Sequence, residues 1–133
     1  MSNILFWGGK SKARILVKML YDIYKNKYKI ELVYDPTLDS LYFSDELKFT
    51  NNYKILIKKF HKFSHFVPCI GGEHGYARVQ TSKELKSLGL KPVSLISQHS
   101  ILDDLDKIGE GIQVMPGAIV HKFCSIGDYC ILN

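Results

Sequence analysis

Two pairs of glycines, each placed directly after a short apolar run, are the positions in this sequence best suited to binding a phosphate group. Glycine lets the backbone approach a ligand closely, and a helix that begins beyond such a turn offers free N–H groups to an anion. At the first pair the candidate binding residues are Gly8, Gly9, Lys10 and Ser11. The stretch Gly-Gly-Lys-Ser-Lys matches neither the dinucleotide fingerprint nor the P-loop, so a purely structural turn is the alternative.

The second pair, Gly71 and Gly72, also follows an apolar run, and two such pairs would border one crevice. Arg78 lies further on, one turn into a segment with helical spacing. Its guanidinium group could bind a phosphate through its fork of donors. A surface ion pair with Glu73 or Glu84 is the alternative for this arginine.

Another apolar run ends in an acidic residue, Asp35, followed by Pro36. The Asp35 carboxylate could accept hydrogen bonds from the edge of a uracil or a ribose. Equally, an aspartate before a proline is common in turns for purely local reasons. Both interpretations stay open at this point.

An alternation of strands and helices would bring these residues to one edge of a sheet. Ile4–Trp7 predicts a strand buried on both faces, and the helical spacing that follows predicts a helix with Ser11 as its N-cap. Lys29–Tyr34 predicts the second strand of a βαβ unit, whose two strands are parallel. Ligands of open parallel sheets bind beyond the carboxyl ends of the strands, which is where the candidate residues lie.

The same pattern continues, so we predict a Rossmann-like α/β domain with a parallel sheet over residues 1–95. The further elements are helices over 53–63 and 76–88, a strand over 66–70, and a strand or extended linker over 92–96. Gly89 is placed to end the last helix as a left-handed C-cap. The stretch 37–52 has no clean period and is expected to be mostly irregular.

Residues 96–133 have a six-residue period instead of a helical or strand period. Aliphatic side chains recur at every sixth position, namely Ile96, Leu102, Ile108, Val114, Val120, Ile126 and Leu132. Such a period predicts a solenoid in which the first residue of each hexapeptide points inward and the fifth fills a corner. The later fifth positions are apolar and mostly small: Ile112, Ala118, Cys124 and Cys130. Three hexapeptides make one triangular coil, whereas antiparallel hairpins over 102–133 are the alternative.

The order of these motifs resembles the PglD/NeuD-type sugar acyltransferases over essentially the whole chain. The likeness rests on the two strands that end in glycines or Asp-Pro and on the segments His65–Gly72, Leu88–Leu90 and Ile108–Val120. It implies a Rossmann-like domain that binds a UDP- or dTDP-linked amino sugar, followed by a left-handed parallel β-helix that forms a homotrimer. It also implies acetyl-CoA as co-substrate between neighbouring β-helices, with acetyl transfer to a sugar amine or hydroxyl in surface polysaccharide or glycan synthesis.

Two features depart from that family. Ser97 and Gln98 stand where its members usually have His-Pro, and the catalytic histidine segment of the family lies about one coil beyond Asn133. His121 has similar neighbours to that catalytic histidine but lies one residue out of register, so it is a weak candidate. We therefore expect a C-terminally truncated member that binds a nucleotide sugar, without enough groove to hold acetyl-CoA or to turn it over.

The composition of the chain argues against nucleic-acid binding, a metal site and a membrane span. The formal net charge is +5, but the lysines are spread along the helical polar faces, which favours solvated surfaces over nucleic-acid binding. The three cysteines form no C-x-x-C pair, so we expect buried free thiols and no metal site. The sequence shows no signal-peptide pattern and no apolar run of the ~20 residues that a membrane span needs, which predicts a cytoplasmic protein.

Three functions remain open from the sequence. The first is a nucleotide-sugar acetyltransferase or a remnant of one, and the second is a non-catalytic nucleotide-sugar-binding module. The third, an unrelated Rossmann-like dehydrogenase or ligand-binding domain, is disfavoured because the dinucleotide fingerprint is absent.

Overall fold

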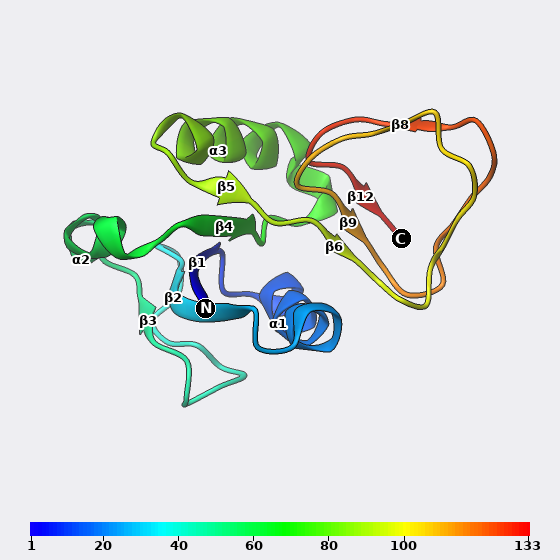
Figure 1. The fold of residues 1–133 in the computed structure, drawn as a ribbon. Coiled ribbons are helices and arrows are strands. Elements are labelled where there is room, and N and C mark those ends of the chain that lie inside the picture. Colours follow the sequence, from blue (N-terminus) through cyan, green and yellow to red (C-terminus); the bar gives the residue numbers. More distant parts are fainter.

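The computed structural model describes residues 1–133, and it consists of an α/β part and a triangular β-helix that lie side by side (Figure 1). The α/β part contains β1 (Ser2–Trp7), α1 (Ser11–Tyr24), β2 (Tyr28–Tyr34), β3 (Phe49–Thr50), α2 (Tyr53–Lys59), β4 (His65–Pro68), α3 (Gly75–Ser87) and β5 (Lys91–Pro92). Short 3₁₀ turns follow α2 (Phe60–Lys62) and precede α3 (Gly72–His74). None of the helices is both long and apolar enough to cross a membrane.

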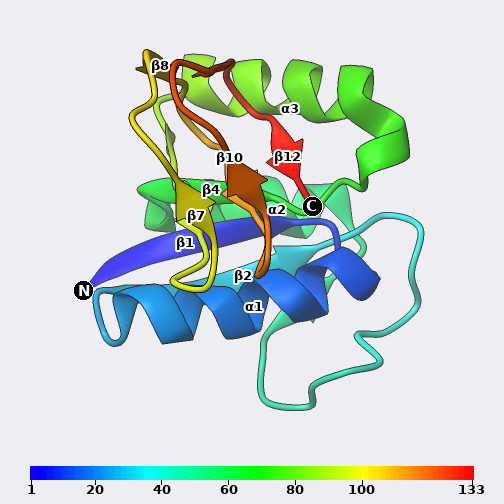
Figure 2. The ribbon, with the colours of Figure 1, turned by 90° about the vertical axis from the view of Figure 1, so that its right-hand side faces the viewer.

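The five strands of the α/β part form one parallel sheet in the order β3-β2-β1-β4-β5. Ile4 and Phe6 of β1 pack with residues of α1, whereas Leu5 packs with residues of α2 and α3. Helices therefore cover both faces of the sheet, as Figures 1 and 2 show. The prediction that the first strand is buried on both faces is confirmed, since all three residues are fully buried. The chain leaves β1 toward β2 on one side and reaches β4 on the other, so the strand order reverses at β1.

The ends of the elements correct some details of the prediction. Ser11 is the first residue of α1 and not its N-cap, because Lys10 has the extended backbone of the N-cap position and no side chain caps the helix. The stretch 37–52 contains the short strand β3, which extends the sheet at its edge. The strand expected over 66–70 spans His65–Pro68 instead, although the Cys69 N–H still donates to the Trp7 carbonyl at 2.7 Å.

The prediction for the end of α3 is confirmed. Gly89 has a φ of 97°, its N–H donates to the Lys86 carbonyl at 3.0 Å, and the Leu90 N–H donates to the Leu85 carbonyl at 3.1 Å. These two bonds make a Schellman motif, in which Leu85 and Leu90 also pack together in the core.

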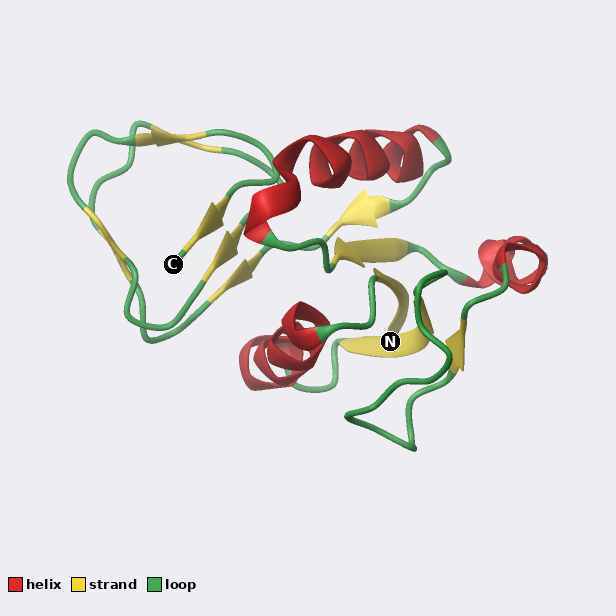
Figure 3. Cartoon of the chain, turned by 180° about the vertical axis from the view of Figure 1, so that it is seen from behind, coloured by secondary structure: helices red, strands yellow, loops and turns green.

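The β-helix keeps the six-residue register along its whole length. Its two-residue strands are β6 (Leu95–Ile96), β7 (Ile101–Leu102), β8 (Lys107–Ile108), β9 (Gln113–Val114), β10 (Ile119–Val120), β11 (Ser125–Ile126) and β12 (Ile131–Leu132). Strands of successive coils pair in parallel, β6 with β9, β9 with β12, β7 with β10, and β8 with β11. Partners such as Ile101 and Ile119 are 18 residues apart, which is three hexapeptides per coil. The alternative of antiparallel hairpins is therefore wrong, and Figure 3 shows the triangular outline of the coils.

The positions predicted to point inward differ in how far they are buried. Ile112, Val114, Ala118 and Ile126 form the buried core of the β-helix. Ile108 is instead 48% exposed and Cys124 is exposed, contrary to the expectation that both point into a filled interior. Ile126, which pairs with Ile108 on β11 of the same two-stranded sheet, is nevertheless buried, so the six-residue period alone does not set the degree of burial.

The β-helix and the α/β part share their hydrophobic cores. Leu95 and Met115 pack with the residues on the α1 side of the sheet, and Tyr129 packs with those on the α2 and α3 side. Two hydrogen bonds add to this junction, from the Tyr24 hydroxyl to the Ser94 carbonyl at 2.7 Å and from Gln113 Nε2 to the Pro68 carbonyl at 2.7 Å. The junction fixes the β-helix against the end of the sheet.

The side chain of Tyr129, in the second coil, packs into the core on the α2 and α3 side of the sheet. Its side chain is 3% exposed, and its hydroxyl donates to Glu110 Oε1 at 3.2 Å. Glu110 is in turn paired with Lys86 of α3. Burial, together with the neighbouring Glu110 carboxylate, raises the pKa of Tyr129 to about 12. The phenol therefore stays protonated and remains a donor at neutral pH.

Candidate functional site

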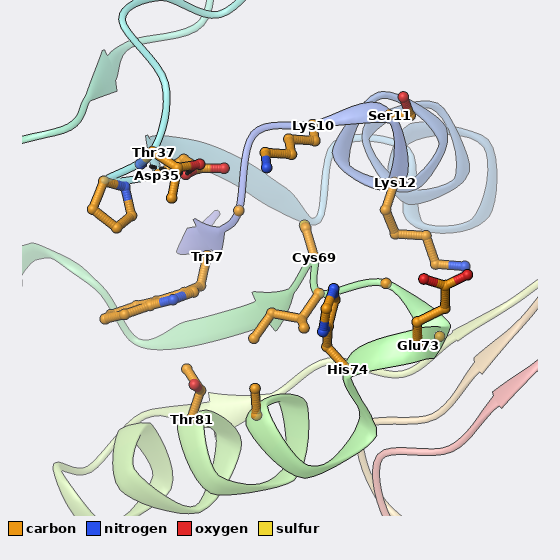
Figure 4. A pocket seen from close by; sticks show the side chains of 16 residues that line it. Trp7, Lys10, Ser11, Lys12, Asp35, Thr37, Cys69, Glu73, His74 and Thr81 are labelled. Carbon is orange, nitrogen blue, oxygen red and sulfur yellow. Dashed lines mark hydrogen bonds between the residues drawn. The ribbon is translucent and has the colours of Figure 1, made fainter.

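The largest cavity, with a volume of about 680 Å³, lies at the carboxyl ends of β1, β2 and β4 (Figure 4). Seven of the residues predicted from the sequence line this pocket: Gly8, Lys10, Ser11, Asp35, Pro36, Gly71 and Gly72. The structure thus brings both glycine pairs and the Asp-Pro turn together around one space. Its position follows the general rule for open parallel sheets, because the strand order reverses at β1 directly beneath it.

The first glycine turn is shaped by close backbone contacts. Gly8 has a φ of 114°, and a Cβ atom there would lie 2.6 Å from the carbonyl oxygen of Cys69. The Gly8 N–H donates to the Tyr34 carbonyl at 2.7 Å, which holds the turn against the end of β2. Only glycine fits this position without moving the backbone on the opposite side of the pocket.

Gly9 lies behind the turn and does not line the pocket itself. Its N–H donates to Asp35 Oδ2 at 2.9 Å, so the residue supports the pocket wall. Beyond it, α1 begins without a side-chain cap and without an acidic residue in its first turn. The N–H groups of Ser11 and Lys12 have no partner within the protein, so the positive end of α1 is open to a ligand.

Asp35 is a buried carboxylate that organises the wall of the pocket. In addition to the Gly9 N–H, it accepts hydrogen bonds on Oδ1 from the Thr37 N–H at 2.9 Å and the Thr37 hydroxyl at 2.7 Å. Burial acts to raise the pKa of Asp35, but these hydrogen bonds and the nearby Lys10 outweigh it and lower the pKa. The group is therefore ionised at neutral pH, and Oδ2, which accepts only the Gly9 N–H, keeps a lone pair for a further donor.

The second glycine turn has free space around it, whereas the first is in close contact with the backbone of Cys69. A Cβ atom on Gly71 or Gly72 would meet nothing within 4 Å. The turn continues into α3, whose N-cap residue His74 makes no side-chain cap. The N-terminus of α1 and the flank of α3, through Ala77 and Thr81, therefore border the same pocket from different sides (Figure 4).

Arg78 does not line the pocket, and it forms an ion pair with neither Glu73 nor Glu84. Its side chain is buried, with Nε donating to the Tyr129 carbonyl at 2.9 Å and Nη1 donating to the Gly71 carbonyl at 3.0 Å. The expected surface ion pair is therefore wrong. The reason is that the second coil of the β-helix, which covers this side of α3, supplies a carbonyl that the local sequence does not reveal.

Other residues of the pocket were not identified from the sequence. They include Trp7, Lys12, Thr37, Glu73 and Thr81. Lys12 is half-buried with Nζ 4.0 Å from Met115 Sδ, and desolvation followed by the charge of Arg78 lowers its pKa. Lys12 could have been identified from the Lys-Ser-Lys repeat, since it lies in the first turn of α1. Trp7 and Thr81 give no such signal, because their approach depends on how α3 packs.

Cys69 lies at the floor of the pocket as a free thiol. Burial raises the pKa of this thiol well above its ordinary value, despite the nearby Lys12. The thiol is therefore protonated at neutral pH, which does not favour a nucleophilic role. The expectation of buried free thiols holds for Cys69 only, because Cys124 is exposed and Cys130 is half-buried.

His121, the catalytic candidate from the sequence, and His99 both lie away from this pocket. His121 is exposed in the turn after β10, and its Nδ1 accepts from the Lys122 N–H at 2.6 Å. His99 lines a different cavity of about 310 Å³ between the end of α1 and the first coil. No group of three or more His, Cys, Asp or Glu side chains converges as it would around a metal ion.

No known family model and no curated protein matches the sequence. Solved structures do share the fold. GDP-perosamine N-acetyltransferase PerB from Caulobacter crescentus, in complex with CoA and GDP-perosamine, is similar over 100% of this chain and 60% of its own, with 18% identity and a TM-score of 0.73. The acetyltransferase domain of PglB from Neisseria gonorrhoeae is similar over 100% of this chain and 62% of its own, with 17% identity and a TM-score of 0.78.

The PglB domain is also known in complex with acetyl coenzyme A, at 16% identity and a TM-score of 0.75. These neighbours are sugar N-acetyltransferases of the hexapeptide β-helix type, so the resemblance in fold that the sequence indicated is confirmed. The present chain spans about 60% of the length of the neighbouring PerB chain.

Proposed function

We propose that this chain binds a nucleotide-linked amino sugar as the nucleotide-sugar-binding part of an acetyltransferase. The observation that carries the proposal is the pocket of about 680 Å³ that joins two glycine turns, the N-terminus of α1 and two lysines. Its volume lies within the range of roughly 300–1,000 Å³ that is usual for small-molecule sites. The Rossmann-like character of the sheet supports the same conclusion, since its strand order reverses beneath the pocket.

The diphosphate would lie against the start of α1. Ser11 and Lys12, whose N–H groups have no partner within the protein, line the pocket, and the ammonium groups of Lys10 and Lys12 add positive charge. The open backbone at Gly71 permits close approach from the other side. An anion in this position satisfies donors that the protein leaves without partners.

We favour a uracil or thymine base, because the sequence resemblance implies UDP- or dTDP-linked sugars. The PerB neighbour is in complex with GDP-perosamine, so guanine is the competing base. The acetyl donor would be acetyl-CoA, as the CoA-bound neighbours suggest. All three cavities of this chain involve the α/β part, and none is formed by β-helix residues alone. We therefore expect these 133 residues by themselves to bind the nucleotide sugar without retaining acetyl-CoA.

A non-catalytic nucleotide-sugar-binding module is the second candidate function. The position of His121 favours it, because this histidine is exposed in a turn of the β-helix and lines none of the cavities. A general base must reach the amine that it deprotonates.

The cytoplasmic location and the division at residues 95 and 96 remain predictions, although the chain changes from the five-stranded sheet to the β-helix between β5 and β6.

Calorimetric titration with UDP, dTDP, GDP and their amino sugars tests the proposal. We expect binding of at least one nucleoside diphosphate, weakened about tenfold by Lys12→Met, because the variant removes a partly buried cation from the diphosphate position. Lys83→Met is the matched control, since Lys83 is exposed on α3 and lines no cavity. Absence of binding to every nucleotide would contradict the proposed function. Release of CoA thiol from acetyl-CoA and an amino sugar would separate an active enzyme from a binding module.

The β-helix also presents an apolar outer face, which supports the expected homo-oligomer. Ile101 and Ile119 lie opposite each other on β7 and β10 and are 57% and 72% exposed. Phe123, 71% exposed, follows in the next turn. Monomeric proteins rarely expose neighbouring large apolar side chains of this kind. We propose that other copies of this chain cover this face, in a trimer as the sequence resemblance implies.

Light scattering coupled to size exclusion should give three times the mass of one chain for the wild type. Ile119→Asp is expected to shift the population to monomer, because it places a charge at the centre of the apolar face. Tyr42→Asp is the control, since Tyr42 is 60% exposed but lies in the α/β part. A monomeric wild type, or a variant that remains oligomeric, would contradict the assignment of this face.

A further inference from the structure

Trp7 is the single tryptophan of the chain, and it occupies the last position of β1. Its indole contributes to the walls of two adjoining cavities, the main pocket and a small apolar one between α2 and α3. Thr81 of α3 is the other residue that the two cavities share. In the close-up, the indole lies between the Asp35–Thr37 loop and Thr81 (Figure 4).

The position of the ring is set by packing on its other side. Tyr34 contacts the indole edge-to-face with a centroid distance of 4.8 Å, and the ring packs against the core on the α2 and α3 side. A ring held in this way is a preorganised flat surface. A planar ligand group can stack on it without first ordering a flexible side chain.

The two ends of the main pocket differ in chemistry. At one end, Lys12 reaches toward Met115 of the β-helix, and the start of α1 supplies positive charge. At the other end lie Trp7 and Thr81, next to the apolar cavity, where no lysine or arginine lines the wall. A charged diphosphate is favoured at the first end and an uncharged aromatic ring at the second.

The small cavity decides where an aromatic ring can go. Its volume of about 20 Å³ is roughly that of one water probe and is too small for a nucleobase. A base must therefore remain on the main-pocket side of Trp7. The hydroxyl of Thr81 makes no hydrogen bond within the protein, so it is available to the edge of such a base.

On these grounds we propose that Trp7 is the stacking platform for the nucleobase, and that it orients the nucleotide with its base toward α3 and its diphosphate toward α1. The sugar then points toward the β-helix. This inference rests on the proposed function and assigns one of its contacts to a specific side chain. Trp7 thus contributes affinity for the base, whichever base it is, and has no role in recognising phosphate.

Calorimetry with UDP, dTDP, GDP and inorganic pyrophosphate tests the assignment on the wild type, Trp7→Phe and Trp7→Leu. We expect Trp7→Leu to weaken the best-bound nucleoside diphosphate about tenfold or more, as aromatic stacking on a base usually contributes. Trp7→Phe should lose less, because it keeps an aromatic face. The affinity for pyrophosphate should be the same in all three proteins. Tyr76→Ala is the control, since Tyr76 is an 81% exposed aromatic residue that lines neither cavity.

Equal weakening of pyrophosphate and nucleotide by Trp7→Leu would overturn the assignment, because it would indicate general damage to the pocket. Unchanged nucleotide affinity in Trp7→Leu would overturn it as well. Neither outcome contradicts the proposed function. The proposed function is contradicted instead if the wild type binds no nucleotide. In the wild type, the fluorescence of Trp7 should change on addition of the nucleotide but not of pyrophosphate. The same response to both ligands would also contradict stacking.

Discussion

Replacing Tyr129 by alanine is expected to destabilise the protein by about 3–5 kcal/mol, the usual cost of removing a buried aromatic side chain. The ring is 3% exposed and packs with Leu85 and Leu90 in the core on the α2 and α3 side of the sheet. Its removal leaves a cavity at the junction between the β-helix and the α/β part. Urea denaturation followed by circular dichroism gives the free energy of unfolding.

Tyr129→Phe is the matched control for this prediction. It keeps the ring and loses only the hydroxyl contact to Glu110, so about 0.5–1.5 kcal/mol is expected. If the alanine and phenylalanine variants lose the same stability, the hydroxyl network with Glu110 and Lys86 dominates, and the packing argument is wrong.

Gly8→Ala is expected to cost about 2–4 kcal/mol and to abolish nucleotide binding. The cost combines backbone strain at a φ of 114° with overlap between the new Cβ and the Cys69 carbonyl, which is a rigid backbone group. Relief of that overlap must separate the ends of β1 and β4, which form the floor of the pocket. Thermal unfolding and calorimetric titration with nucleotide measure the two effects.

Gly71→Ala controls for the general effect of adding a methyl group at the pocket. Gly71 has a φ of −62°, and its Cβ would meet nothing within 4 Å. Its stability should change little or rise by about 0.4–1 kcal/mol, because alanine restricts the unfolded chain. Equal loss of stability in both variants would contradict the assigned role of the Gly8 conformation.

The register of the β-helix could be predicted from the sequence because one geometric unit repeats. Each strand ends on the aliphatic residue that the six-residue period predicted, from Ile96 to Leu132. The degree of burial could not be predicted in the same way. Ile108 and Cys124 obey the period but are exposed, whereas Ile126, the partner of Ile108 in the same two-stranded sheet, is buried.

In the candidate site, too, features set by neighbouring residues could be predicted, whereas contacts between distant parts of the sequence could not. The glycine turns and Asp35 were found because strand ends can be identified locally. Arg78 was placed wrongly in the sequence-based alternatives, because its partner carbonyl at Tyr129 is 51 residues away. Trp7 and Thr81 were missed because β1 and α3 are brought together only by the sheet order.

The position of Arg78 connects the pocket to the β-helix thermodynamically. One guanidinium holds the carbonyl of Gly71, at the rim of the pocket, and the carbonyl of Tyr129, in the second coil. A ligand that binds only when the Gly71 turn is ordered must therefore stabilise the second coil by mass action. The linkage is reciprocal, so whatever orders the second coil tightens ligand binding by the same factor. Amide hydrogen exchange along β11 and β12 would then report the occupancy of a pocket that neither strand touches.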